Sequence, residues 1–581
     1  MKAIPARLLV LLLTGILNAA PAIAAKPNVL FIALDDLNDW IGCLGGHPQT
    51  LTPNLDRLAA SGALFTNAHC PAPACNPSRT AIMTGLSPHR SGLYDNLQKM
   101  REILPDEVIL PEHFRRNGYW AGGSGKLLHY FIDAPSWDEY FPAKESENPF
   151  PRTLYPPQRP LSLPRGGPWQ YVETDWGALN VDDEEYGGDW LVTKWVGEQL
   201  SRPHPKPFFL ACGIYRPHEP WFVPAGYFKP FPLADIQLPP GYLEDDLDDL
   251  PPEGRRRGPN RYFAHIRKHG QWRRAVQAYL ASIHYADTML GRVLDALEQG
   301  PHRNNTIVVL WSDHGWQLGE KQHWQKFTPW RAVTRVPLMI RVPKNAAPGL
   351  PGGTTAGSVC PSPVNLLSLF PTLTELTGIP EKRNADGPSL VPLLRDPAAE
   401  WNHVSLTHMA DPGSYALSAR DWRLIQYANG ENELYDIAKD PFEWTNLAAK
   451  PAHADRLAKL RQLGPQKFAP KKEPSLAALT ALPWHAAADG PAPPSRPDGG
   501  TFPVHFINGK KRPVEICWMN RQGKAISYGK IDAGKVHQLN TRSGAVWQIR
   551  DPATGAELGH FVVGDRKAKA AIPATPTDGS Q

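Results

Sequence analysis

The sequence predicts an α/β protein built on a doubly wound, mainly parallel sheet. It contains four short apolar runs, NVLFIAL, YWAGG, FFLACGI and TIVVLW, which are typical of strands buried on both faces. Helical patterns separate these runs, and polar side chains follow each of them. Because ligands of such sheets bind beyond the carboxyl ends of the strands, we expect a functional site at that edge.

The elements follow one another in a regular order along the chain. The residues after the four runs are, in order, Asp35 and Asp36, Lys126 and His129, His218, and Asp313 and His314. Helical periodicity is clear over residues 52–62, 110–118 and 272–300, and the last of these stretches stops at Gly300. Strands and helices therefore alternate, as the doubly wound fold requires.

The chain of 581 residues is too long for one compact domain. We place the main α/β domain at residues 26–385 and a smaller α+β subdomain of short antiparallel strands and a helix at 386–470. A Pro- and Ala-rich linker is expected at 471–503, a small all-β sandwich at 504–565, and a disordered tail at 566–581.

The N-terminus has the pattern of a secretory signal peptide over residues 1–24. Lys2 and Arg7 precede an apolar run, and Ala22 and Ala24 form a small-residue cleavage site. No later segment reaches membrane-spanning length, so we expect a periplasmic or secreted protein that does not span a membrane. The net charge of +5 does not point to nucleic acid, and six cysteines are too few for a disulfide scaffold.

Acidic residues at two strand ends indicate a metal site. Asp35, Asp36 and Asp313 would meet at the sheet edge together with His314, and such a group of carboxylates requires a cation. Mainly oxygen ligands favour calcium, with magnesium as the alternative. The competing interpretation is that the DDLND stretch only caps a helix.

Cationic residues near the same edge indicate an anionic ester as substrate, a phosphate or a sulfate. Isolated lysines or histidines in loops are usually only solvated, but here several of them follow successive strands. The candidates are Arg79, Lys126, His129, His218 and Lys326.

The stretch CNPSRTAIMTG, which begins at Cys75, resembles the signature of the formylglycine-dependent sulfatases. The resemblance covers about residues 27–450 and implies an alkaline-phosphatase-like fold. The stretches SDHGWQLGE, HWQKF, RPHEP and LLSLFPTL are most similar to iduronate-2-sulfatase and its bacterial relatives. As in that group, His314 follows the metal-binding aspartate where many sulfatases have asparagine.

The resemblance implies a role for each candidate residue. A maturation enzyme would oxidise Cys75 to formylglycine, whose hydrate is the nucleophile and a metal ligand beside Asp35, Asp36, Asp313 and His314. Arg79 would orient the formylglycine hydroxyls. Lys126 and Lys326 would neutralise charge on the sulfate, His218 would protonate the leaving alcohol, and His129 would take the proton of the second hydroxyl.

The expected substrate is a sulfated carbohydrate, with a 2-O-sulfated uronic acid or a similar glycan unit as the favoured case. Three alternatives stay open: phosphonate or phosphodiester hydrolysis on the same fold, a choline-sulfatase-like activity, and a glycan-binding protein whose Cys75 is never modified.

Residues 504–563 resemble the β-domain of the von Hippel–Lindau tumour suppressor. Of the residues with which that domain binds hydroxyproline peptides, Tyr528 and Trp547 are matched, Thr541 stands in place of a serine, and Ala545 stands in place of a histidine. We therefore expect a sandwich that packs on the enzyme or tethers it to a surface, with binding of a protein or glycan as the alternative.

Overall fold

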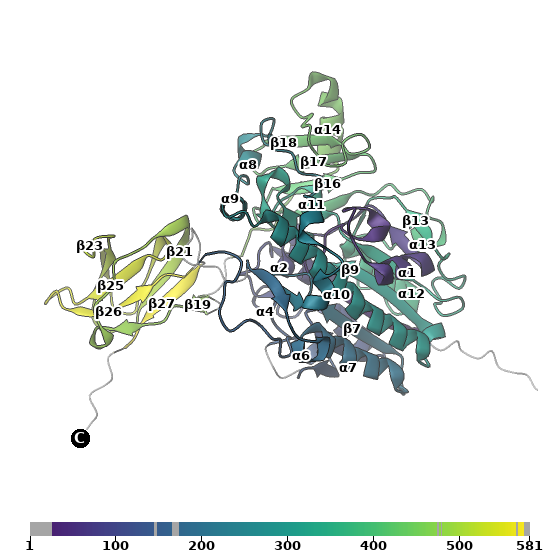
Figure 1. Ribbon diagram of the computed structural model, residues 1–581, viewed down its shortest axis with the longest axis horizontal. Coiled ribbons are helices and arrows are strands. Elements are labelled where there is room, and N and C mark those ends of the chain that lie inside the picture. Colours follow the sequence, from purple (N-terminus) through teal and green to yellow (C-terminus); the bar gives the residue numbers. More distant parts are fainter. Residues whose placement is uncertain are drawn as a thin grey trace, which may run out of the picture.

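The computed structural model describes residues 26–143, 148–164, 174–472, 476–477, 479–564 and 567–574. The predicted signal peptide lies outside these residues and stays a prediction. Figure 1 shows a large α/β body, a smaller sheet above it and a β-sandwich to one side.

An eight-stranded sheet in the order β13-β2-β12-β9-β1-β7-β4-β5 forms the centre of the body. Its three shortest strands are β13 (Ser358–Cys360), β2 (Ala63–Phe65) and β5 (Glu139–Phe141). The four predicted apolar runs form its central strands, which pair in parallel. They are β1 (Asn28–Leu34), β4 (Trp120–Gly125), β7 (Phe208–Ile214) and β9 (Thr306–Ser312). The antiparallel strand β12 (Leu338–Arg341) lies beside β9. The predicted α/β fold is confirmed.

Helices cover both faces of the sheet, because alternate residues of β1 point into two separate cores. Leu30, Ile32 and Leu34 pack with one set of helices. This set contains α1 (Pro53–Ser61), α7 (Asp189–Ser201) and α10 (Trp272–Gln299), which ends before Gly300. The opposite core contains α2 (Cys75–Thr84), α5 (Leu110–Arg116) and α12 (Leu369–Thr377).

The smaller subdomain is built on one antiparallel sheet in the order β15-β16-β17-β18. Its strands are Ser405–His408, Tyr415–Ser418, Trp422–Gln426 and Asn432–Asp436, and α14 (Ala454–Gln462) follows them. The predicted start at residue 386 is too early. Helix α13 (Val391–Arg395) buries Val391, Leu393 and Leu394 in the core of the main body, so the boundary lies closer to Ser405.

The C-terminal module is a sandwich of two sheets, β19-β27-β21-β24 and β20-β26-β25-β22-β23. Its longer strands are β21 (Asp498–Asn508), β22 (Val514–Met519), β23 (Ala525–Ile531), β24 (Val536–Ser543), β25 (Val546–Arg550) and β26 (Glu557–Val562). They enclose a core of their own around Phe506, Ile516 and Trp547.

Two predicted boundaries of this module are wrong. The linker at 471–503 contains β19 (Thr480–Ala481), β20 (His485–Ala486) and the start of β21. The tail at 566–581 contains β27 (Ala568–Ile572), which pairs with β21 and buries alternate side chains. Prolines and alanines suggested unstructured chain, but long-range pairing with the sandwich supplies the missing hydrogen bonds. None of the helices in the described part of the chain is long and apolar enough to cross a membrane.

Candidate active site

The structure places every predicted site residue at the carboxyl edge of the central sheet. Asp35 and Asp36 follow β1, Lys126 follows β4, and Asp313 follows β9. Cys75 is the first residue of α2, and its Sγ lies 3.8 Å from Asp35 Oδ1. All of these residues are buried except His129, which is half-buried.

The spacing of the CNPSR stretch explains how Arg79 reaches the same site as Cys75. Residues four positions apart lie on one face of a helix, so Cys75 and Arg79 both point toward the sheet. The hydroxyl of Ser78 donates a hydrogen bond to the Asp313 backbone carbonyl at 2.6 Å and fixes the helix against β9. Gly85, with φ of 71°, ends the helix in the left-handed conformation.

Three carboxylates meet around one point. The ligand atoms of Asp35, Asp36 and Asp313 all lie within 4.8 Å of one another. Asp36 has φ of 63°, a strained conformation for a residue with a side chain, and Tyr279 stabilises it by donating to its carbonyl at 2.8 Å. One carboxylate oxygen of Asp36, Oδ2, is buried and has no hydrogen-bond partner among the residues that the structure describes. This donor set fits a hard divalent cation.

Basic side chains balance part of this negative charge. Arg79 donates to Asp313 Oδ2 at 2.8 Å and to Asp35 Oδ1 at 3.1 Å, while Lys326 lies 2.8 Å from Asp36 Oδ1 and Lys126 pairs with Asp35 Oδ2. Burial opposes ionisation of Asp35, but Lys126 and Arg79 outweigh it and hold the pKa of that carboxyl below its usual value.

The Cys75 sulfur lies at the centre of the cationic groups. Its Sγ is 3.0 Å from Lys326 Nζ, 3.3 Å from His314 Nε2 and 3.7 Å from Lys126 Nζ. Burial alone would raise the pKa of this thiol, but Lys126 and Lys326 lower it well below its usual value. Position 75 therefore stabilises a negatively charged group.

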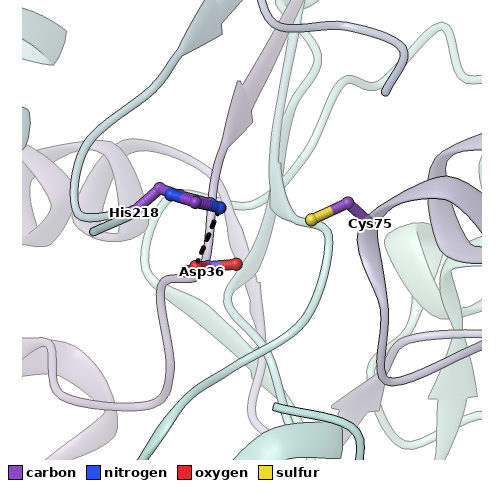
Figure 2. Close-up of side chains that lie close together, drawn as sticks. All are labelled: Asp36, Cys75 and His218. Carbon is purple, nitrogen blue, oxygen red and sulfur yellow. Dashed lines mark ion pairs between the residues drawn. The ribbon is translucent and has the colours of Figure 1, made fainter. Parts of the chain in front are cut away.

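Two histidines approach position 75 with different proton affinities. Figure 2 shows His218 facing Asp36, with Nε2 3.6 Å from Asp36 Oδ2, and the Cys75 sulfur pointing toward both. Burial opposes protonation of His218, but Asp36 prevails and raises its pKa. Burial lowers the pKa of His129, a shift only partly offset by its hydrogen bond to Cys75. One histidine is thus suited to donate a proton and the other to accept one.

Two tyrosines that the sequence patterns did not predict contact Lys126. The rings of Tyr130 and Tyr215 lie 4.8 Å and 5.3 Å from Lys126 Nζ, and Tyr215 stacks on His218 at 4.8 Å. Each tyrosine stands close in sequence to a predicted histidine, so proximity to the motifs was the available signal. Both extend the site beyond the reacting groups.

The fold and the site together define a hydrolase of the alkaline-phosphatase-like class, with acids for a metal ion and cations for an anionic ester. A model of the sulfatase family matches residues 27–379, and this chain belongs to the sulfatase family. A model of the C-terminal region of N-sulphoglucosamine sulphohydrolase matches residues 319–466.

Individual relatives agree with this assignment. A sulfatase of Formosa agariphila is 40% identical over 76% of this chain and 87% of its own length. Iduronate 2-sulfatase of Mus musculus is 32% identical over 65% of this chain and 74% of its own length.

Solved structures share the fold at lower identity. A 2-O GAG sulfatase, 22% identical, has a TM-score of 0.57 and covers 75% of this chain and 91% of its own. A phosphonate monoester hydrolase of Agrobacterium radiobacter, also 22% identical, has a TM-score of 0.58 and covers 75% of this chain and 96% of its own. The fold alone therefore does not select sulfate over phosphonate esters.

Proposed function

We propose that this protein is an exported sulfatase that removes sulfate from a sulfated carbohydrate, with a 2-O-sulfated uronic acid unit as the favoured substrate. Membership of the sulfatase family makes it a sulfuric ester hydrolase. The observation that carries the proposal is Cys75 in its CNPSR motif, held between the carboxylates and two lysines. The similarity to iduronate 2-sulfatase supports the substrate class.

Sulfatases of this family use a formylglycine and a divalent metal ion. We propose that a maturation enzyme converts Cys75 to formylglycine and that Asp35, Asp36, Asp313 and His314 hold the ion, calcium in preference to magnesium. When present, the two groups supply a hydrated aldehyde as nucleophile and a cation that lowers the pKa of its hydroxyl.

The chain's own residues bind and orient the ester. Lys126 and Lys326 both approach position 75 and stabilise the charge on the sulfate oxygens. Arg79 keeps Asp35 and Asp313 in place through its paired hydrogen bonds.

The histidines move the protons. His218 Nδ1 donates to the Glu219 carbonyl at 2.5 Å, so Nε2 is the nitrogen that faces the site and gives its proton to the leaving oxygen. His129, whose neutral form is favoured by burial, accepts a proton from the group at position 75.

Mass analysis of the peptide that contains Cys75 tests the proposal directly. Protein made in a host with the maturation enzyme should carry the aldehyde, and Cys75→Ser and Cys75→Ala should reduce sulfate hydrolysis by at least about 10³-fold. An unmodified thiol in protein that lacks turnover would instead support the glycan-binding alternative. Retention of the N-terminal 24 residues in exported protein would contradict the proposed signal peptide.

Substrate comparison separates the remaining alternatives. Sulfate, phosphate and phosphonate esters of one alcohol should be hydrolysed under identical conditions, and the sulfate ester should react fastest. A faster phosphoester or phosphonate would overturn the sulfatase proposal, and a marked preference for choline sulfate would overturn the carbohydrate substrate.

Chelation tests the metal site. Removal of divalent ions with EDTA should abolish turnover and lower the thermal stability, because the three buried carboxylates then repel one another. Calcium should restore both properties better than magnesium.

We further propose that the C-terminal sandwich binds the anionic glycan and keeps the enzyme on its substrate. Residues 504–574 hold 12 of the 62 Lys and Arg residues but only 5 of the 57 Asp and Glu residues, so the rest of the chain is slightly acidic. Several of these cations gather at one end of the sandwich, where buried Asn508 bonds to the carbonyls of Arg512, Ile531 and Lys535 and joins two loops. Such a surface fits a polyanion.

A further inference from the structure

A cavity of about 350 Å³ adjoins the active site on the side of Lys126. Tyr130 and Tyr215 line it, and the same two rings contact the Lys126 ammonium group. Tyr215 also stacks on His218, the group that faces the leaving oxygen. The cavity therefore begins where the alcohol part of the ester must lie.

Aromatic rings form part of the cavity wall. Phe150 meets Tyr130 and Tyr215 edge-on, with ring centroids 5.4 Å and 5.0 Å apart, and Tyr155 and Tyr186 also line the space. Rings with apolar faces and a few polar groups between them are typical of small-molecule sites. These walls suit the C–H faces of a sugar ring.

A buried guanidinium lies in the same cavity. Arg216 is only 1% exposed and donates to the Tyr186 hydroxyl at 2.5 Å, to the His218 carbonyl at 2.8 Å and to the Phe222 carbonyl at 3.3 Å. Within the described residues it has no ion pair with a carboxylate. Asp189, an acid that also lines this cavity, instead accepts hydrogen bonds from the backbone N–H groups of Tyr215 and Arg216 itself.

A second guanidinium belongs to Arg159, which also lines the cavity. It lies 3.3 Å from Asp175 and covers the rings of Tyr155 and Phe222 at 5.3 Å and 5.2 Å. Two arginines thus face one cavity, and the more buried of them, Arg216, forms no ion pair with a carboxylate among the described residues. A buried charge is stabilised when an opposite charge reaches it, and a bound ligand can supply that charge.

We propose that this cavity binds the leaving sugar and that Arg159 and Arg216 recognise a second acidic group on it, a carboxylate or another sulfate. This inference rests on the proposed sulfatase function and adds to it the residues that select the sugar. The guanidinium groups bind the acidic group, the aromatic walls hold the ring, and His218 lies at the shared boundary with the scissile ester.

A panel of substrates tests the inference, beginning with a 2-O-sulfated uronate, the same sugar with its carboxyl reduced to an alcohol, and an aryl sulfate without a sugar. Wild-type enzyme should prefer the uronate over its reduced analogue by roughly 10- to 100-fold in kcat/KM, the worth of a charge-assisted hydrogen bond. A sugar with a second sulfate in place of the carboxyl shows which acidic group is preferred. Equal rates for all the sugars would overturn the inference.

Arg159→Gln is the informative variant, because Arg159 is partly exposed and its ion pair is with Asp175, which is not one of the reacting groups. It should raise KM for the acidic sugar about tenfold and have a much smaller effect on kcat and on the aryl sulfate reaction. Arg152→Gln is the matched control, since Arg152 lies on the same segment, is exposed and does not line the cavity. Identical behaviour of the two variants would contradict the proposal.

Binding of the desulfated uronate gives a readout without turnover. Calorimetry should detect it with wild-type enzyme and show weaker binding with Arg159→Gln and with Arg216→Lys. If Arg216→Lys does not fold, the calorimetric affinity of Arg159→Gln for the desulfated uronate tests the inference by itself. Failure of the enzyme to cleave even the aryl sulfate would overturn the proposed function and this inference with it, whereas cleavage without preference for an acidic sugar would overturn the inference alone.

Discussion

The proposed role of His218 can be tested by comparing substrates whose leaving groups differ in their need for a proton. A sugar alcohol is a poor leaving group and needs a proton as the S–O bond breaks, whereas nitrophenolate leaves without one. His218→Asn should therefore reduce kcat/KM for a sugar sulfate by roughly 10²- to 10⁴-fold and for nitrophenyl sulfate by much less. Equal losses on both substrates would show that His218 binds sulfate instead.

Arg79 contributes to stability as well as to the site. Its guanidinium bonds to Asp313, Asp35 and the Lys126 carbonyl at once, a geometry that lysine does not reproduce. Arg79→Lys should lower the free energy of unfolding by about 3 kcal/mol in urea denaturation. The exposed pair of Arg57 and Asp295 supplies the control, because Arg57→Lys should cost less than about 1 kcal/mol.

Among the secondary-structure elements, the C-terminal end of β4 determines the position of Lys126, which follows it directly. Gly125 has φ of 74°, and a Cβ atom built on it would lie 2.0 Å from the Gly213 carbonyl on β7. Gly125→Ala should therefore destabilise the protein by more than about 2 kcal/mol and reduce activity by moving Lys126. Gly118→Ala is the control. Gly118 also has a positive φ, 90°, but a Cβ atom built on it meets no other atom within 4 Å, so this variant measures the cost of backbone strain without a steric clash.

The turn that follows β10 (Gln317–Leu318) contains a buried acid, Glu320, whose pKa is raised to about 7 by burial. Because the folded pKa lies above the unfolded one, this group contributes stability at low pH, and the contribution is lost as the pH rises toward about 7. Glu320→Gln lacks this titration and keeps an oxygen to accept from the Leu318 N–H.

The stability of Glu320→Gln relative to wild type should accordingly rise by up to about 3 kcal/mol between pH 4.5 and pH 7.5. Chemical denaturation across that range measures the difference. The exposed Glu400→Gln should show no comparable trend. A pH-independent difference for Glu320→Gln would mean that Glu320 is ionised throughout.

At the scale of the whole molecule, the C-terminal sandwich should act separately from catalysis, because it has its own core. Truncation after Lys472 should leave kcat/KM for an aryl sulfate within about twofold and abolish salt-sensitive retention on an immobilised sulfated polysaccharide. The truncated enzyme must keep Lys472, because this residue is attached to the main body. Its side chain donates a hydrogen bond to the Ile103 carbonyl, and its own carbonyl accepts one from the Gln98 side chain. Unchanged retention of the truncated enzyme would contradict a binding role for the sandwich.

Alanine substitutions at Lys511, Lys530 and Lys535 test which surface of the sandwich binds the polysaccharide. In the full-length enzyme they should weaken retention on the immobilised sulfated polysaccharide. Alanine substitutions at Arg521 and Lys524, in the turn between β22 and β23, should have a smaller effect.

Local pattern was sufficient to predict the central sheet and to predict which candidate residues lie at its carboxyl edge. Runs of buried residues predicted β1, β4, β7 and β9, and the residues after them lie at one edge because parallel strands share that edge. The subdomain boundary, the linker and the tail were misjudged, because short strands such as β27 depend on partners far away in sequence.

Neighbouring residues alone were enough to predict the fold class, to recognise the CNPSR motif and to select the candidate acids, lysines and histidines. Which of these side chains contact one another became clear only from the folded chain. Arg79 meets Asp313, Lys326 meets Asp36, and Arg216 lies in a cavity beside Lys126, across separations that strand order and loop packing alone define. The periodicity of a segment indicates which of its faces is buried. Which distant residue each side chain contacts depends on how segments far apart in the sequence pack together.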